Sequence, residues 1–310
     1  MKRWIALLLS ILIMVVILSR INLQELKNYV RLMDPAMLLL AVFLFIPQIL
    51  ITSFRWKRMI ARKVNISLWE SIKLILAGNA LNILLPSRMG DLSKAYFLKK
   101  EGKLEIKRGT NIVLFEKYID LASLGIVILA GIASQPEINQ PNVIGAGYAF
   151  TAIGVFPLLY LVPPGKWLNR PFFDRFRLLS KIRNFLLDLQ DYILELKQHP
   201  RHVGFIIFLS ITLWFTHVIQ FYVFFRALQS QIPMSQVFRL VPLAMLFGLI
   251  PITMAGIGTR DSAMIYLLAP YESVPKIVGV GIFASLRYFV PGLLGLPFLN
   301  KYVAREDQVS

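Results

Sequence analysis

The 310-residue sequence contains no cysteine and only three histidines. The lack of cysteine excludes disulfide bonds and thiolate ligands. His199, His202 and His217 are too few and too scattered for a metal cluster, so we expect no metal and no other cofactor. Charged residues are scarce too, at 16% of the chain, whereas composition averages for soluble domains are about 25%. With a hydrophobic content of 56%, this composition excludes a soluble globular domain of this size.

Long apolar runs account for this composition. A helix needs about 20 apolar residues to cross the hydrocarbon core of a bilayer, and several runs reach or approach that length. They cover residues 4–19, 36–54, 111–115 with 121–133, 143–162, 203–225 and 277–299. We interpret the first run as a retained helix rather than a signal peptide, because it is long and has no small-residue cleavage site. The sequence therefore predicts an all-α polytopic membrane protein with about six full crossings.

Basic residues exceed acidic residues by 34 to 17, but their placement does not indicate nucleic-acid binding. They gather between the apolar runs, at 55–63, 94–108 and 166–183, while the linkers 134–142 and 228–236 contain no Lys or Arg. This asymmetry is typical of cytoplasmic loops. We therefore expect a multi-pass protein of the plasma (inner) membrane with cytoplasmic N- and C-termini, and no nucleic acid among its partners.

The same charge rule predicts a re-entrant hairpin, which enters the membrane without crossing it. If the apolar stretch 68–85 crossed fully, the lysines after it would lie outside, so we expect the chain to turn back at a break over 86–90. A second apolar arm, a break at 251–258 and a short second arm follow later. The sequence thus predicts two re-entrant broken-helix hairpins.

Each hairpin lies between two apolar helices, which suggests an inverted-topology repeat within a single integral membrane domain, 1–310. The half-repeats are 36–133 and 203–299, and an amphipathic cytoplasmic connector at 163–202 joins them. The stripe of the connector fits either a helix lying on the membrane or one packed on its loop partners. Paired broken helices in two halves indicate a transporter's binding site near the middle of the bilayer.

Both breaks carry an arginine, an aspartate and glycines where a short helix begins. These residues are Arg88, Gly90 and Asp91 in the first hairpin, and Gly256, Gly258, Arg260 and Asp261 in the second. Helix N-termini attract anions and the guanidinium fork fits phosphate oxygens, so two facing tips would clamp a phosphate group. Two other interpretations stay open: each aspartate either caps its helix or holds the nearby arginine in an ion pair.

Further polar residues interrupt apolar helices. Glu116 and Asp120 lie one turn apart and are either an interfacial charge cluster, partners of a buried arginine or protonatable groups. Arg287 has apolar neighbours on both sides and needs a counter-ion or a phosphate. Asn79 and Asn82 are either substrate contacts or contacts between packed helices.

Three motifs resemble those of the membrane domain of the lysylphosphatidylglycerol synthase family, the flippase-like integral membrane proteins of bacteria and archaea. They are "LPSRMGDLSKAYFL", which contains Lys94, "EKYID", which contains Glu116, Lys117 and Asp120, and "AGIGTRD" at the second break. Asp91, Lys94 and Asp261 stand where the family more often has Glu, Arg and Glu, so these contacts differ in reach. The resemblance extends over roughly residues 5–300.

The resemblance implies a role in handling lipids in a bacterial or archaeal plasma membrane. The best-known members carry a soluble aminoacyl-transferase domain after the membrane part and move the aminoacylated lipid across the bilayer. Because no such domain follows the last predicted helix, we expect a stand-alone member rather than an enzyme.

We therefore expect a lipid translocase that binds an anionic phospholipid or a polyprenyl-phosphate lipid between the two hairpin tips. A membrane enzyme that makes this lipid is the expected protein partner. The alternative is an integral membrane transferase acting on a polyprenyl- or phospholipid-linked substrate, in which Glu116, Asp120 and Asp91 would supply acid–base groups. The sequence predicts neither the particular lipid nor the oligomeric state.

Overall fold

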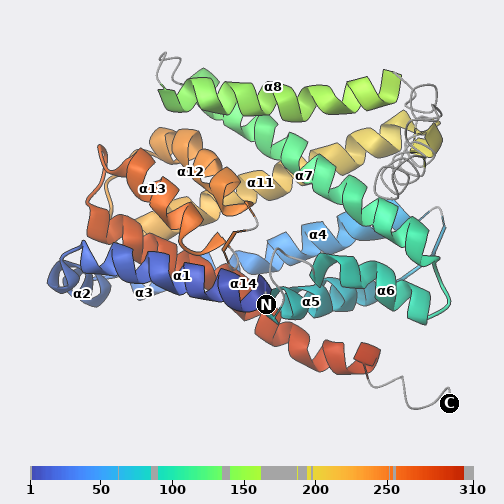
Figure 1. The fold of residues 1–310 in the computed structure, drawn as a ribbon, viewed down its shortest axis with the longest axis horizontal. Helices are drawn as coiled ribbons and strands as arrows, with labels where there is room; N and C mark the ends of the chain where they lie inside the picture. The colour runs from blue at the N-terminus through green and yellow to red at the C-terminus, as the bar shows by residue number, and fades with distance from the viewer. Residues whose placement is uncertain are drawn as a thin grey trace.

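The computed structural model describes residues 2–61, 63–84, 90–134, 140–161, 187, 194–196, 198–250, 252–253 and 256–303. This part of the chain forms twelve helices and no strand (Figure 1). The helices are α1 (Lys2–Ser19), α2 (Leu23–Arg31), α3 (Pro35–Phe43), α4 (Phe45–Ile60), α5 (Leu68–Leu84), α6 (Ser93–Lys100), α7 (Ile106–Ser134), α8 (Gln140–Leu161), α11 (Pro200–Ala227), α12 (Met234–Gly248), α13 (Thr259–Leu268) and α14 (Val274–Val303).

Several of these helices are long and apolar enough to cross a membrane. Within the described residues they are Pro35–Ile60, which comprises α3 and α4, Pro200–Ala227 and Val274–Leu299. A fourth crossing results if α1 and α2, which meet at an angle of 93°, form one broken span. The all-α polytopic membrane class is confirmed, while the count of six crossings and the orientation of the termini stay predictions.

Local sequence sets where the first helices begin. The Asn22 side chain accepts hydrogen bonds from the backbone N–H groups of Gln24 and Glu25 and so caps α2. Asp34 caps α3 in the same way, and Pro35 fits the first turn because its missing N–H would have no partner there. The sharp bend before α2 brings α1 against α13, across one face of the bundle (Figure 1).

Each predicted hairpin corresponds to a pair of packed helices, α5 with α6 and α12 with α13, while its re-entrant course in the membrane stays a prediction. In each pair a glycine of the predicted break meets a glycine of the first arm. A Cβ atom at Gly90 would lie 2.5 Å from the carbonyl oxygen of Gly78, and one at Gly256 would lie 2.6 Å from that of Gly248. Larger residues would force the arms apart, so these glycines close the hairpins.

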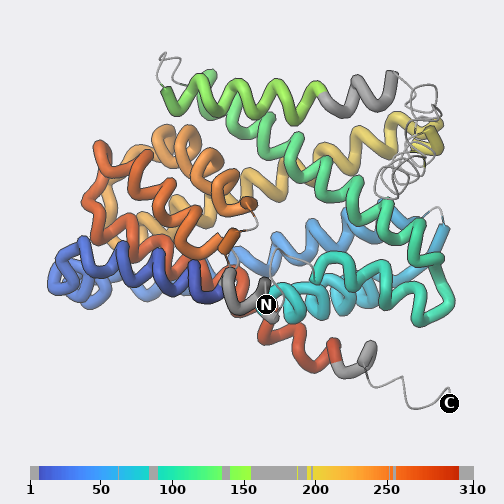
Figure 2. The backbone as a smooth tube through the Cα atoms, in the orientation of Figure 1, coloured from blue at the N-terminus to red at the C-terminus, as the bar shows by residue number. Residues whose placement is uncertain are grey.

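The two halves of the chain exchange packing partners (Figure 2). The first arm of each hairpin lies along the last helix of the other half: α5 packs on α14, and α12 packs on α7. Glycines allow this close approach, because a Cβ atom at Gly295 would lie 1.9 Å from the Leu76 carbonyl oxygen and one at Gly131 would lie 2.7 Å from that of Phe238. Reciprocal packing of this kind is what two half-repeats related by a pseudo-two-fold axis require.

Some predicted features lie outside the described residues. These are Arg88 and the rest of the first break, 85–89, together with most of the connector 163–202. The boundaries of the half-repeats and the direction in which each hairpin enters the membrane stay predictions.

Candidate functional site

A cavity of about 450 Å³ lies where the two halves meet. Its wall is mostly apolar, and α1, α4, α5, α6, α7, α11 and α14 contribute to it. Asp91, which directly follows the first break, and Ile257 of the second break both line it. The volume falls in the range of roughly 300–1,000 Å³ that is typical of small-ligand sites. The α1 part of the wall is lined by Leu7, Ser10, Ile11, Met14, Val15 and Leu18.

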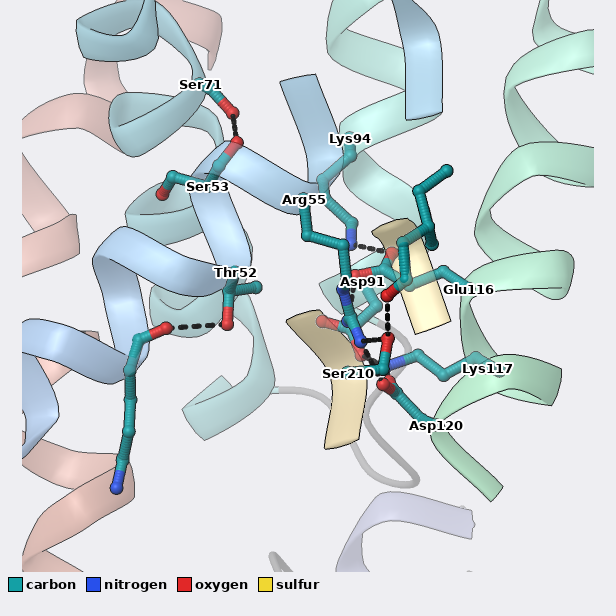
Figure 3. A network of polar contacts seen from close by, with 12 residues as sticks. Thr52, Ser53, Arg55, Ser71, Asp91, Lys94, Glu116, Lys117, Asp120 and Ser210 are labelled. Carbon is teal, nitrogen blue, oxygen red and sulfur yellow. Dashed lines mark hydrogen bonds and ion pairs between the residues drawn. The ribbon is translucent and has the colours of Figure 1, made fainter. Parts of the chain in front are cut away.

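A cluster of charged side chains forms the polar part of the wall, with Arg55 of α4 at its centre (Figure 3). The Arg55 guanidinium donates one hydrogen bond to Glu116 Oε1 over 2.9 Å and another to Ser210 Oγ over 2.8 Å, and it also pairs with Asp120. Arg55 is only 1% exposed and Glu116 only 2%. An uncompensated buried charge is strongly destabilising, and the two carboxylates compensate the charge of Arg55 here.

Two lysines complete the charged cluster. Lys94 of α6 pairs with the second oxygen of Glu116 and lies 4.4 Å from the centroid of the Trp56 ring. Lys117 of α7 pairs with Asp91, at the end of the first break, and lies 4.0 Å from Asp120 Oδ2. Cations and carboxylates therefore alternate from the buried Lys94 to the half-exposed Lys117.

Helical spacing and small residues bring this cluster together. Glu116 and Asp120 lie one turn apart on α7 and so face the same side. α6 approaches α7 closely because Gly109 has no side chain: a Cβ atom there would lie 2.7 Å from that of Ala95, the neighbour of Lys94. The α5–α6 hairpin thus places Lys94 next to Glu116 of α7, the helix that follows it in the chain.

The lining of the cavity has a small positive surplus. Among its described residues four side chains are cationic and three are carboxylates. The cations are Arg55, Lys94, Lys117 and Arg287, and the carboxylates are Asp91, Glu116 and Asp120. An anionic group bound beside them would balance the surplus charge.

The cavity unites many of the residues singled out in the sequence. Seven of them line it: Asn79, Asn82, Asp91, Lys94, Glu116, Asp120 and Arg287. Asn82 donates to Asp91 over 3.0 Å. Arg287 enters from α14; its guanidinium donates to the Tyr288 hydroxyl over 2.8 Å and lies 5.2 Å from the Phe221 ring centroid. Gly90 lies beside them, against α5.

The second tip has a different arrangement. Arg260 is 1% exposed and does not appear among the described residues lining this cavity. Its guanidinium donates to Asp261 Oδ1 over 2.6 and 2.9 Å and to the Gly281 carbonyl oxygen over 2.7 Å. Asp261 Oδ2 also accepts from the Gly258 N–H over 2.9 Å. Of the open interpretations for this tip, both the cap and the ion pair are present.

The glycines of the second tip serve chain packing. Gly256 and Gly258 have φ angles of 74° and 98°, which other residues rarely adopt. A Cβ atom at Gly258 would lie 3.0 Å from Ile13 of α1. Asp261 lines a smaller cavity of about 270 Å³, which shares Met14 with the main one. Since Arg88 lies outside the described residues, the pairing of Arg88 with Arg260 around one phosphate stays a prediction.

Sequence reasoning missed Arg55, which it assigned to the cytoplasmic basic segment 55–63. The signal that reveals it is helical periodicity, because Trp56, Met59 and Ile60 are apolar and continue the helix of the run 36–54 for another turn and a half. All three are buried in the structure, as is Arg55 between them and α7. Gln48, Trp214 and His217 are further lining residues that the sequence alone did not indicate.

The sequence matches the family described as lysylphosphatidylglycerol synthase TM region over residues 3–295. No match was found among curated proteins.

Proposed function

Because the chain belongs to the lysylphosphatidylglycerol synthase TM region family, whose role concerns membrane lipids, we propose that it is a lipid translocase. Its substrate is an anionic phospholipid or a polyprenyl-phosphate lipid, and the headgroup occupies the main cavity during passage between the leaflets. The observation that carries the proposal is one cavity that combines an apolar wall with a charged cluster of net positive charge.

The apolar and the charged parts of the cavity suit the two parts of a lipid. The headgroup phosphate lies beside Lys94 and Lys117, whose ammonium groups act as donors to anionic oxygens. The first methylene groups of the chains contact α1 at Ile11 and Val15, which line the cavity and are 50% and 56% exposed. The chains thus remain close to the bilayer while the charge is shielded from it, which lowers the main barrier to crossing.

Lys117 offers a sharp test of this proposal because the chain contains a matched control. The side chains of Lys117 and Lys103 are 36% and 34% exposed, and both form ion pairs with carboxylates. Of these two lysines, only Lys117 is among the described residues that line the cavity. Substituting either lysine with glutamine removes one ion-paired, half-exposed charge, so a difference between the variants reports on the cavity rather than on charge in general.

The experiment uses the purified full-length protein in liposomes that contain headgroup-labelled phosphatidylglycerol. The label in the outer leaflet is quenched by an impermeant reagent, and the rate at which the inner-leaflet label becomes accessible is measured. We expect Lys117→Gln to slow this rate about tenfold, as the loss of one charge-assisted contact implies, while Lys103→Gln retains the wild-type rate. Equal rates for the two variants would contradict the proposal. It would also be contradicted if the wild-type protein moved no anionic lipid faster than protein-free liposomes do. Chemical conversion of the lipid, detected by mass spectrometry, would favour the transferase alternative instead.

A further inference from the structure

Arg55 occupies the point at which three helices meet. It comes from α4, and its guanidinium contacts Glu116 and Asp120 of α7 and Ser210 of α11. Helices α4 and α11 belong to the first and the second predicted half-repeat, and they pack against each other. The position of Arg55 is therefore tied to both halves, whereas the two lysines of the cluster come from helices of the first half.

The contacts divide the carboxylate oxygens in a regular way. Glu116 presents Oε1 to Arg55 and Oε2 to Lys94. Asp120 presents Oδ1 to Arg55, and its Oδ2 lies 4.0 Å from Lys117 Nζ. Each carboxylate is thus shared between Arg55 and one lysine (Figure 3).

This division keeps the lysines from being outnumbered by carboxylates. Lys117 also pairs with Asp91, so with Arg55 present three cations share three carboxylates and the charges of the cluster balance. Without Arg55, Lys94 and Lys117 would face three carboxylates, and the net negative charge would weaken their attraction for another anion. Because the cluster is largely buried, such charge effects are weakly screened.

We propose that Arg55 is a positioning residue for the headgroup phosphate. It does not bind the phosphate itself; it holds Glu116 and Asp120 so that Lys94 and Lys117 are fixed in place and only partly neutralised. This inference rests on the proposed function, since it names the residue that gives the site its affinity for an anion.

The guanidinium suits this role in a way that an ammonium group does not. Its planar fork reaches both carboxylates with separate nitrogens, and Nη1 also donates to Ser210 Oγ over 2.8 Å. A lysine at this position would carry the same charge but cannot hold both carboxylates in that geometry. The Arg55→Lys variant is therefore expected to fall between the wild type and Arg55→Gln.

Binding of dodecyl phosphate to the purified full-length protein, measured by isothermal titration calorimetry, tests the inference. Arg55→Gln is expected to weaken binding about tenfold, which equals about 1.4 kcal/mol. The double variant Arg55→Gln/Asp120→Asn removes one charge of each sign, and so is expected to recover most of the lost affinity. Arg58→Gln is the matched control, because Arg58 lies one turn further along α4, is exposed, and contacts the rings of Phe54 and Phe205 instead of the cavity.

The outcomes separate the inference from the function on which it rests. If the wild type does not bind dodecyl phosphate, the proposed function is wrong and the inference falls with it. If the wild type binds and the folded Arg55→Gln variant binds equally well, Arg55 has no positioning role. A double variant that binds no better than Arg55→Gln would also overturn the inference, since a purely structural arginine predicts no rescue. Should Arg55→Gln fail to fold, Arg55→Lys decides the question: wild-type affinity in that variant would refute the role of the fork.

Discussion

Glu116→Gln should make the protein less stable by itself and more responsive to anionic lipid. Glu116 is 2% exposed and divides its two oxygens between Arg55 and Lys94. Glutamine preserves the shape and one acceptor oxygen but removes the negative charge. Breaking a buried ion pair by removing one partner typically costs about 3–5 kcal/mol, and here two buried cations lose the same partner.

The same substitution raises the positive surplus of the cavity lining from one charge to two, because three carboxylates become two while the four cations remain. An anion bound in the cavity then replaces the negative charge lost with the Glu116 carboxylate. A ligand at about 100 times its dissociation constant stabilises the folded state by roughly 2.7 kcal/mol. If the extra charge tightens binding about tenfold, the variant gains about 1.4 kcal/mol more from the same lipid than the wild type does.

Thermal unfolding in nanodiscs measures both effects. Without anionic lipid the Glu116→Gln variant should unfold at a clearly lower temperature than the wild type. Phosphatidylglycerol in place of phosphatidylcholine should then raise its melting temperature by more than it raises that of the wild type. Glu70→Gln is the control, because Glu70 pairs with Lys103 outside the cavity. A smaller lipid response in Glu116→Gln than in the wild type would refute the assignment of the cavity as an anion site.

Two other predictions concern packing and topology. Gly295→Ala should destabilise the protein by about 1–3 kcal/mol, because the added Cβ would lie 1.9 Å from the Leu76 carbonyl oxygen. Gly204→Ala is the control: its added Cβ would have nothing within 4 Å, so this variant should be neutral or stabilised by up to about 1 kcal/mol. Equal melting temperatures of the two variants would contradict the reciprocal packing. Single cysteines placed in the natural cysteine-free chain should react with impermeant maleimide from outside at 228–236 and only from inside at 163–202, and the reverse pattern would overturn the predicted orientation.

The main elements of the fold follow from the sequence because hydrophobic periodicity and chain breakers act locally. The apolar runs became helices, and both breaks became hairpins closed by glycine pairs. The bend between α1 and α2 was not predicted, although Asn22 is a strong helix-capping residue. The reciprocal packing of α5 on α14 and of α12 on α7 depends on contacts far apart in the sequence, which local patterns do not specify.

The candidate site was predictable where charge interrupts an apolar helix. Glu116, Asp120 and Arg287 each violate the surrounding hydrophobic pattern, and all three line the cavity. Arg55 was not predicted to line the site because it is the first of several basic residues at a helix end, where charged side chains are ordinarily exposed to solvent. Its burial results from the approach of α7 and α11, which is a tertiary contact.

The aspartates that follow the two breaks have different surroundings, and this difference predicts different effects for equivalent substitutions. Asp261 is 4% exposed in its side chain and pairs with Arg260, which is 2% exposed, so Asp261→Asn leaves a buried arginine short of its counter-ion. This change should cost about 3–5 kcal/mol and should lower the melting temperature in every lipid. Asp91 is 16% exposed and pairs across the cavity wall with the half-exposed Lys117, an arrangement in which an ion pair contributes about 1 kcal/mol or less.

Asp91→Asn should therefore leave the melting temperature nearly unchanged in phosphatidylcholine while strengthening the binding of dodecyl phosphate, because Lys117 loses a competing anion. Calorimetry and thermal unfolding of the two variants side by side distinguish the roles. If Asp261→Asn altered phosphate affinity and Asp91→Asn did not, the charge of the site would have to come from the second hairpin. The first half of the chain instead supplies six of the seven charged groups in the described lining, namely the cations Arg55, Lys94 and Lys117 and the carboxylates Asp91, Glu116 and Asp120. These six charges balance, so the surplus of one positive charge comes from Arg287 of α14. The reciprocal packing of the halves thus builds the cavity, and the first half supplies most of its charged groups.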